Sequence, residues 1–273
     1  MKAFVSWSGR KLCTLLLLCL LSASLNAAAL RIVSLAPSLT QNLQYLGAEK
    51  DLVGCTNYCI TTTKKQVVAT AVKVNVELVL ALKPDLVVAT NMTSKGTIAT
   101  LRKFGINVVA YPMAKSFEDI CSQFLDLGKR TGREAKALEV LRKTRQKVNQ
   151  LKAIPHKPLK MFMQIGADPL FTVVPHTFMN DYITFAGGEN IAYDLRIGSI
   201  TRETVLKRNP DVIFIVTMGI IGNSQKKQWE AVRSLNATKN KNIFIVNSDK
   251  ACTPSPVSFA ETLEEMVNCI RKH

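Results

Sequence analysis

An internal repeat constrains the fold of this chain more than any other feature. Residues 77–88 read ELVLALKPDLVV and residues 203–214 read ETVLKRNPDVIF, so Glu, Val, Leu, Pro and Asp recur at an offset of 126 residues. Each copy predicts a helix that ends before the proline, because proline disfavours helical geometry in the residue before it, followed by a buried strand. The repeat therefore predicts two structurally equivalent halves.

Continuous apolar runs, separated by helical stretches, predict the class of fold. Such runs are typical of strands that are buried on both faces of a parallel sheet. A helix is expected over residues 38–46, with Ser38 as its cap after Pro37 and Gly47 at its end. We predict an α/β fold with two similar α/β lobes, each built around a central parallel sheet. The predicted strands are residues 31–35, 86–89, 108–111, 161–165, 212–216 and 243–246.

A segment between the two halves has no strand character. Residues 134–152 contain no Gly or Pro and are rich in strong helix formers, and at about 1.5 Å per residue they would span roughly 28 Å. Apolar residues recur there at helical spacing: Leu138, Leu141, Val148 and Leu151. We predict one long connecting helix within residues 131–156, between an N-terminal lobe over 30–130 and a C-terminal lobe over 157–273.

Residues 1–29 have the pattern of a secretory signal peptide. Three basic residues precede an apolar run over residues 12–21, and small residues follow up to Ala29. Ten apolar residues are about half of what a membrane-spanning helix needs. We expect this segment to be cleaved and the mature chain to be exported in soluble form.

The formal charge of the whole chain is +16, from 36 Lys and Arg against 20 Asp and Glu. Residues 129–160 hold eleven of the basic residues and only Glu134 and Glu139 as acids, so this segment contributes +9. A solvated helix face explains such a run, and contact with an anionic envelope surface is a second hypothesis. Since the excess lies on the connecting helix of an exported chain, we expect no nucleic-acid partner.

Signatures of catalysis are missing from the sequence. It contains no G-x-S-x-G, P-loop, H-E-x-x-H or C-x-x-C motif. The mature chain has only His156, His176 and His273, which leaves few residues for a histidine-centred site. An apolar fraction of 47% and a charged fraction of 21% are those of an ordinary globular protein. We predict a protein that is not an enzyme and has no cofactor.

Five cysteines remain after the predicted cleavage, an odd number for an oxidising compartment. Cys252 and Cys269 flank the last helical segment and are predicted to form a disulfide. Cys55 and Cys59 form a C-x3-C pair without a second Cys or His pair, which favours plain thiols or a local disulfide over a zinc site.

Several motifs, in this order along the chain, resemble the periplasmic binding proteins of ABC importers for vitamin B12, haem and ferric siderophores. These motifs are RIVSLAPSLT at 31–40, LGA at 46–48, LVGCTNY at 52–58, LKPDLV at 82–87 and FAGGENI at 185–191. Two more, QIGADPLFT at 164–172 and TRETVL at 201–206, are most similar to the cobalamin-binding branch. The resemblance implies a monomeric periplasmic protein that captures a corrinoid between two lobes joined by one helix. It would deliver this macrocyclic ligand to a permease dimer with its ATPase.

The resemblance also implies a binding site on loops at the carboxyl ends of the strands. Aromatic residues belong there because a flat macrocycle stacks on rings. The implied ligand contacts are Pro37, Ser38, Tyr58, Asp168, Phe171 and Asp249. Alternatives within the class are haem, with Tyr58 as a ligand to iron, or a ferric siderophore. An enzyme resembling a metal chelatase is a more distant alternative.

Glu77 and Glu203 occupy equivalent positions in the two repeats. The resemblance implies that each docks onto arginines of a two-fold symmetric permease, and twin acids suit such a partner. The structural alternative is that each glutamate only stabilises its own helix, because a negative charge is favourable near a helix N-terminus. Apart from Trp7 the chain has one tryptophan, Trp229, expected in a surface helix, whereas the cobalamin branch usually lines its pocket with tryptophans. The ligand therefore stays open among a corrinoid, haem and a siderophore.

Overall fold

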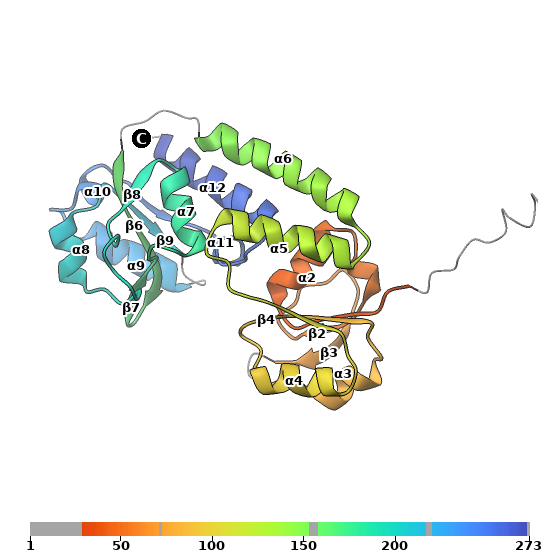
Figure 1. The fold of residues 1–273 in the computed structure, drawn as a ribbon. Coiled ribbons are helices and arrows are strands. Elements are labelled where there is room, and N and C mark those ends of the chain that lie inside the picture. The colour runs from red at the N-terminus through yellow and green to blue at the C-terminus, as the bar shows by residue number, and fades with distance from the viewer. Residues whose placement is uncertain (1–28, 71–72, 153–157, 217–219, 272–273) are drawn as a thin grey trace, which may run out of the picture. The chain divides into compact units, whose positions relative to one another are not determined.

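Two β-sheets of five strands each, one from each half of the chain, form the framework of the computed structural model (Figure 1). The first sheet has the order β3-β2-β1-β4-β5, and all its strands are parallel. Its strands are β1 (Ile32–Ser34), β2 (Leu52–Thr56), β3 (Gln66–Ala69), β4 (Leu86–Thr90) and β5 (Val108–Tyr111). The structure describes residues 29–70, 73–152, 158–216 and 220–271.

The second sheet has the order β10-β9-β6-β7, and β8 pairs with the first part of β6. Its strands are β6 (Leu159–Ala167), β7 (Leu170–Thr172), β8 (Gly188–Asn190), β9 (Val212–Ile215) and β10 (Ile243–Ile245). All pairs are parallel except β6 with β7, which form an antiparallel hairpin. The predicted α/β class with two central sheets is confirmed, although β7 makes the second sheet mixed.

Helices follow most of the strands, as a parallel sheet requires. They are α2 (Pro37–Tyr45), α3 (Val76–Ala81), α4 (Lys95–Lys103), α5 (Phe117–Arg130), α6 (Glu134–Lys152), α7 (Phe178–Phe185), α8 (Arg202–Arg208), α9 (Ile220–Glu230), α10 (Asn236–Lys239), α11 (Ser248–Ala251) and α12 (Pro256–Arg271), with a 3₁₀ turn at Glu49–Asp51. The four residues of β9 are fully buried, which agrees with a strand covered on both faces. Within the described ranges, no helix has the length and apolar character needed to cross a membrane.

The aspartates of the two Pro–Asp turns make the same kind of hydrogen bond in both halves of the chain. Asp85 Oδ2 accepts a hydrogen bond from the backbone N–H of Arg31 at 2.8 Å, at the entry to β1. Asp211 Oδ2 accepts one from the backbone N–H of Lys160 at 3.0 Å, near the entry to β6. Asp85 thus holds the start of β4 against β1, and Asp211 holds the start of β9 against β6. The two copies are structurally equivalent, as the repeat predicts.

The residues before the two prolines also match. Lys83 has φ 45° and Asn209 has φ 44°, both in the left-handed region. Because the proline that follows disfavours right-handed helical geometry, the chain leaves its helix at this residue. The helix of each repeat therefore stops at the predicted place.

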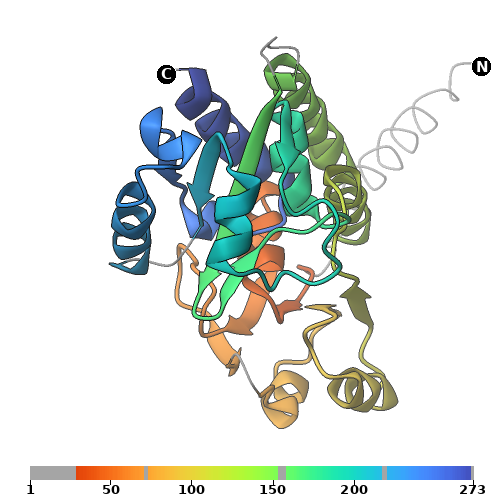
Figure 2. The same cartoon turned by 90° about the vertical axis from the view of Figure 1, so that its left-hand side faces the viewer.

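Helix α6 has the bounds predicted for the connecting helix, Glu134–Lys152. It packs against α5 and α12, which lie beside it (Figure 1 and Figure 2). Leu141 and Val148 are buried as expected, but Leu138 is 51% exposed, so the buried stripe of α6 is narrower than predicted. The boundaries of the two lobes stay a prediction, and residues 1–28 of the predicted signal peptide lie outside the described residues.

Two local expectations are wrong. Helix α2 begins with Pro37 at its first position, and the cap residue is Ala36, so Ser38 does not cap it. Trp229 is fully buried rather than exposed, and its indole Nε1 donates to Gln164 Oε1 at 2.7 Å. The guanidinium of Arg202 lies over the indole ring, 4.6 Å from its centroid. Trp229 is therefore a core residue of the second sheet's half of the chain.

The predicted disulfide between Cys252 and Cys269 is not formed in this structure. Cys252 ends α11, whereas Cys269 lies 13 residues after the first residue of α12. At about 1.5 Å per residue this separation is roughly 20 Å of helix. A disulfide requires Cα atoms within about 7 Å of each other, and Cys252 lies four residues before α12 begins, at the opposite end of that helix from Cys269.

Candidate functional site

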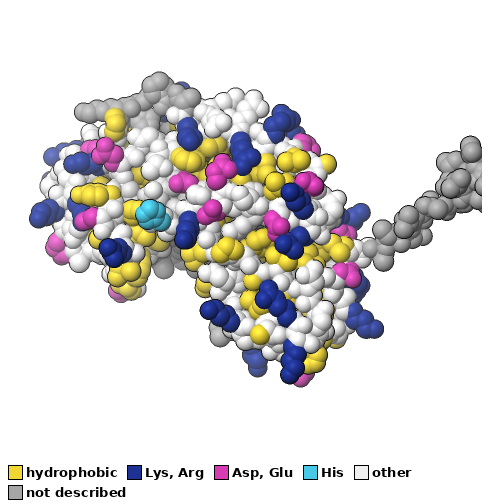
Figure 3. Space-filling model, in the orientation of Figure 1, with side chains coloured by type: hydrophobic (Ala, Val, Ile, Leu, Met, Phe, Trp, Pro, Cys, Tyr) yellow, Lys and Arg dark blue, Asp and Glu magenta, His cyan; other side chains and the backbone are white. Residues whose placement is uncertain are grey.

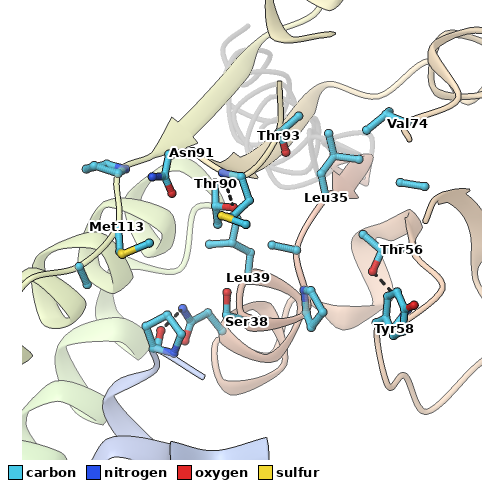
Figure 4. Close-up of a pocket in the computed structure, with 18 of the residues that line it drawn as sticks. Leu35, Ser38, Leu39, Thr56, Tyr58, Val74, Thr90, Asn91, Thr93 and Met113 are labelled. Atoms are coloured by element: carbon cyan, nitrogen blue, oxygen red, sulfur yellow. Dashed lines mark hydrogen bonds between the residues drawn. The ribbon is translucent and has the colours of Figure 1, made fainter. Parts of the chain in front are cut away.

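A cavity of about 640 Å³ lies at the carboxyl ends of the strands of the first sheet (Figure 4). All five strands contribute to its wall at or just after their last residue. These residues are Leu35, Thr56, Ala69, Thr90 and Pro112. The chain adds β2 and β3 on one side of β1 and then β4 and β5 on the other, so the strand order reverses between β1 and β4, and open α/β sheets bind ligands at such a point. The topology thus places the cavity where this class of fold binds small molecules.

Three large apolar side chains stand exposed around the cavity. Tyr58 is 60% exposed, Met92 81% and Met113 59%. Figure 4 shows Tyr58 on one side of the cavity and Met113 on the other. An aromatic ring stacks on flat ligands, and the flexible thioether of methionine adapts to irregular surfaces. The rim therefore suits a large ligand with apolar faces.

The polar groups of the cavity are mostly uncharged. Hydroxyl and amide side chains come from Ser38, Asn91 and Thr93, among others (Figure 4). Lys73 is the one charged side chain among the described residues that line the cavity. The wall thus offers neutral donors and acceptors, and the large positive charge of the chain is not concentrated there.

The turn after β2 presents Tyr58 to the cavity. The backbone N–H of Cys59 donates to the carbonyl of Thr56 at 3.1 Å, which closes a tight turn. The N–H of Tyr58 also donates to Thr56 Oγ1 at 3.3 Å. These bonds fix the backbone of Tyr58 while its ring stays mostly free for a ligand.

The structure brings together half of the residues for which the resemblance implied ligand contacts. Pro37, Ser38 and Tyr58 line the cavity. The others lie on the second half of the chain and are not among its lining residues: Asp168, Phe171 and Asp249. Asp168 and Phe171 lie in the β6–β7 hairpin, and Asp249 lies in α11. Their contact with ligand stays a prediction.

Sequence reasoning missed two of the most exposed residues of the rim. Met92 lies two residues after β4, and Met113 lies two residues after β5. Both strands were predicted, and carboxyl ends of parallel strands meet at one edge of a sheet. The position of Met92 and Met113 shortly after a predicted strand could therefore have identified both as residues of the binding site.

The second half of the chain closes part of the cavity. Phe178, at the start of α7, contributes an aromatic ring to the wall, and Cys252 and Pro254 contribute from the loop after α11. Asn42 of α2 donates from Nδ2 to the carbonyl of Pro254 at 3.4 Å. The cavity is thus formed mainly by the first sheet, with a smaller contribution from the second half.

Glu77 and Glu203 lie in equivalent, exposed places. Each is two residues after the cap residue of a short helix, Asn75 for α3 and Thr201 for α8, and each cap side chain accepts a backbone N–H of its helix. Hydrogen bonds from its own backbone N–H and from Thr201 lower the pKa of Glu203. Both glutamates are exposed to solvent, and so a partner could reach them.

The basic residues of α6 and its flanks are interspersed with acids (Figure 3). Arg145 pairs with Glu118 of α5, and Lys147 pairs with Glu264 of α12, each at 2.6 Å. Among the described residues, five further pairs involve this segment: Lys129 with Glu134, Arg130 with Asp126, Arg133 with Asp51, Lys136 with Glu139, and Lys143 with Glu139. Much of the local charge is thus balanced at short range.

Comparison with known proteins identifies the family of the chain. Residues 32–250 match the model of the family described as periplasmic binding protein. A cobalamin-binding protein of Halobacterium salinarum is 28% identical over 263 residues, covering 90% of this chain and 70% of that protein. A vitamin B12-binding protein of Yersinia pestis is 32% identical over 208 residues, covering 73% of this chain and 74% of that protein.

Solved structures show the same fold. The crystal structure of a possible iron-binding (periplasmic solute-binding) protein from Staphylococcus epidermidis has a TM-score of 0.77 and 29% sequence identity, covering 88% of this chain and 98% of that chain. The fold, the order of the motifs along the chain and the match to the family model all indicate the same family. The chain belongs to the periplasmic binding protein family.

Proposed function

We propose that this protein is the substrate-binding component of an ABC importer, which captures cobalamin or a related corrinoid and delivers it to the permease. The observation that carries this proposal is the cavity at the switch point of the first sheet, with Tyr58, Met92 and Met113 exposed around it. After loss of residues 1–29 it would act in the periplasm as a monomer. It binds and releases its ligand without chemical change.

The chemistry of the wall favours a corrinoid over haem. A corrinoid has broad apolar faces and many amide groups at its edge, which match the apolar rim and the neutral groups of Ser38, Asn91 and Thr93. Haem carries two carboxylates, which require cationic partners, and among the described residues of the wall Lys73 is the one cation. The names of the H. salinarum and Y. pestis relatives support the same ligand.

Haem or a ferric siderophore is the alternative, and the exposed phenol of Tyr58 favours it. A phenolate oxygen is a ligand that ferric iron accepts. The similarity to the S. epidermidis protein, which is described as a possible iron-binding protein, supports this alternative.

A calorimetric titration of residues 30–273 tests the function. The ligands are cyanocobalamin, cobinamide, haemin and ferrichrome, each in the same buffer. We expect cyanocobalamin or cobinamide to bind with a Kd of about 1 μM or tighter, near −8 kcal/mol. Tight binding of haemin alone would select the alternative, and the absence of binding to all four would refute the proposal.

Docking to the permease is assigned to Glu77 and Glu203. Their equivalent positions on exposed helix starts suit a partner with two-fold symmetry. Charge reversal of both, Glu77→Lys with Glu203→Lys, should abolish stimulation of the importer's ATPase while leaving ligand affinity unchanged. Glu230→Lys, at the exposed end of α9, is the matched control and should leave both measurements unchanged. Normal stimulation by the double variant would refute this docking site.

A further inference from the structure

Two cysteines beside the cavity have no role in the proposed function. Cys55 is the last but one residue of β2 and is 3% exposed. Cys59 lies three residues beyond the strand and is half-buried. Tyr58 comes directly before Cys59 in the chain and lines the cavity. A change in this cysteine pair would therefore act on the part of the wall that presents Tyr58.

The tight turn after β2 returns the Cys59 thiol toward the end of the strand. Cys59 Sγ accepts a hydrogen bond from Thr40 Oγ1 at 3.1 Å and lies 3.2 Å from Thr56 Oγ1. Burial and the neighbouring Cys59 thiol raise the pKa of Cys55 to about 11. A hydrogen bond between the two thiols also contributes to this rise, so the sulfur atoms of Cys55 and Cys59 lie close to each other. The turn brings the Cα atoms of its ends, Thr56 and Cys59, within about 7 Å, and Cys55 directly precedes Thr56. The two cysteines are therefore placed where a disulfide can join them.

We propose that Cys55 and Cys59 form a reversible disulfide that fixes the turn carrying Tyr58. The oxidant is another disulfide, either a small one such as oxidised glutathione or that of a thiol oxidoreductase. Cys59, the more accessible thiol, attacks as thiolate and releases one thiol of the oxidant. The Cys55 sulfur then attacks Cys59, the intramolecular S–S bond forms, and the second thiol leaves with the proton of Cys55. The chain loses two hydrogen atoms, and the oxidant is reduced to two thiols.

The disulfide would further restrict the backbone between the two cysteines, where two hydrogen bonds of the turn already act. Tyr58 would then be held in place on the cavity wall before the ligand arrives. A pre-organised wall binds more tightly, because less ordering remains to be done on binding. We expect the Kd for cyanocobalamin to be roughly fivefold lower in the oxidised protein than in the reduced protein. This expected change in affinity rests on the proposed function, whereas the disulfide itself does not.

Peptide mass mapping tests the disulfide directly. Trypsin releases residues 51–64 as one peptide that contains both cysteines. After treatment with oxidised glutathione and alkylation in denaturant, this peptide should be unalkylated and two hydrogens lighter than its reduced form. The bridge should be absent from Cys59→Ser and present in Cys269→Ser, the matched control. Alkylation of both cysteines in the treated wild-type chain would overturn the proposal.

The NMR signal of Tyr58, in protein with isotope-labelled tyrosine rings, tests the effect of the disulfide on this residue. The signal is assigned with Tyr58→Phe, and it should differ between the oxidised and reduced chains without ligand. An unchanged signal would overturn the claim that the bridge fixes Tyr58. Cyanocobalamin titrations of both forms follow, and equal Kd values would overturn the claim about affinity. If neither form binds cyanocobalamin, the proposed function fails, while the peptide mass and the tyrosine signal still decide the disulfide.

Discussion

Replacement of Tyr58 by alanine tests the binding site at its most exposed ring. An aromatic side chain buries roughly 150–250 Å² when covered, so the 60% of Tyr58 still exposed leaves on the order of 90–150 Å² for a ligand. At about 25 cal/mol per Å² this area is worth about 2–4 kcal/mol. Ordering of the side chain offsets part of that gain. We expect Tyr58→Ala to weaken cyanocobalamin binding by about 10- to 100-fold.

Calorimetric titration of three variants gives the comparison. Tyr58→Phe keeps the ring, so its Kd for a corrinoid should stay within about threefold of the wild-type value. If the ligand is haem bound through phenolate, Tyr58→Phe should instead abolish the iron-dependent spectrum. Tyr193→Ala is the control, because Tyr193 is 75% exposed and does not line this cavity. An unchanged Kd for a folded Tyr58→Ala protein would refute the assignment of the cavity.

Three further predictions concern stability. Trp229→Phe leaves the buried Gln164 Oε1 without its indole donor, so the free energy of unfolding in urea should fall by about 2–4 kcal/mol, and a loss below about 1 kcal/mol would contradict the hydrogen bond. The second prediction concerns the carboxyl of Asp126. Burial raises its pKa, but hydrogen bonds, among them one from Arg130, outweigh this effect and lower the pKa below its value in the unfolded chain. Stability from this carboxylate is therefore present above about pH 4 and lost on further acidification, and Asp126→Asn should make thermal melts less acid-sensitive in that range. Leu141→Ala truncates a side chain of α6 that is 2% exposed, so the free energy of unfolding in urea should fall by about 2–4 kcal/mol. A urea midpoint equal to that of the wild-type protein would show that α6 is not packed at this residue.

The parts of the fold that local sequence dictates could be predicted. The strand at residues 86–89 and the strand at 108–111 are apolar throughout, and each appears within a residue of its predicted end. Helix α6 has its predicted bounds because strong helix formers fill it and no Gly or Pro interrupts it. The Pro–Asp turns added long-range information, since one local motif recurs with the same hydrogen bonds in both halves.

The missed elements depend on contacts that a sequence pattern does not contain. Strand β3 is an edge strand whose first two residues are exposed, and β8 consists of Gly188, Glu189 and Asn190. Each becomes a strand by pairing with a neighbour, β2 or β6. Trp229 lies in α9, whose mostly polar sequence predicts a surface helix, but its ring packs against Phe162 of β6 and its indole N–H donates to Gln164 of the same strand. Tertiary contacts outweighed local preference in these cases.

The packing of α6 against both α5 and α12 has a consequence for biosensor design. Since α6 is tied to α5 through Arg145–Glu118 and to α12 through Lys147–Glu264, both halves of the chain adjoin the same helix along its length. Binding would then change the distance between the halves by little, because packed helices shift only slightly past one another. A pair of fluorophores with one on each half should therefore give a weak change in energy transfer. A single environment-sensitive dye near Met113, on the rim of the cavity, should give the stronger signal.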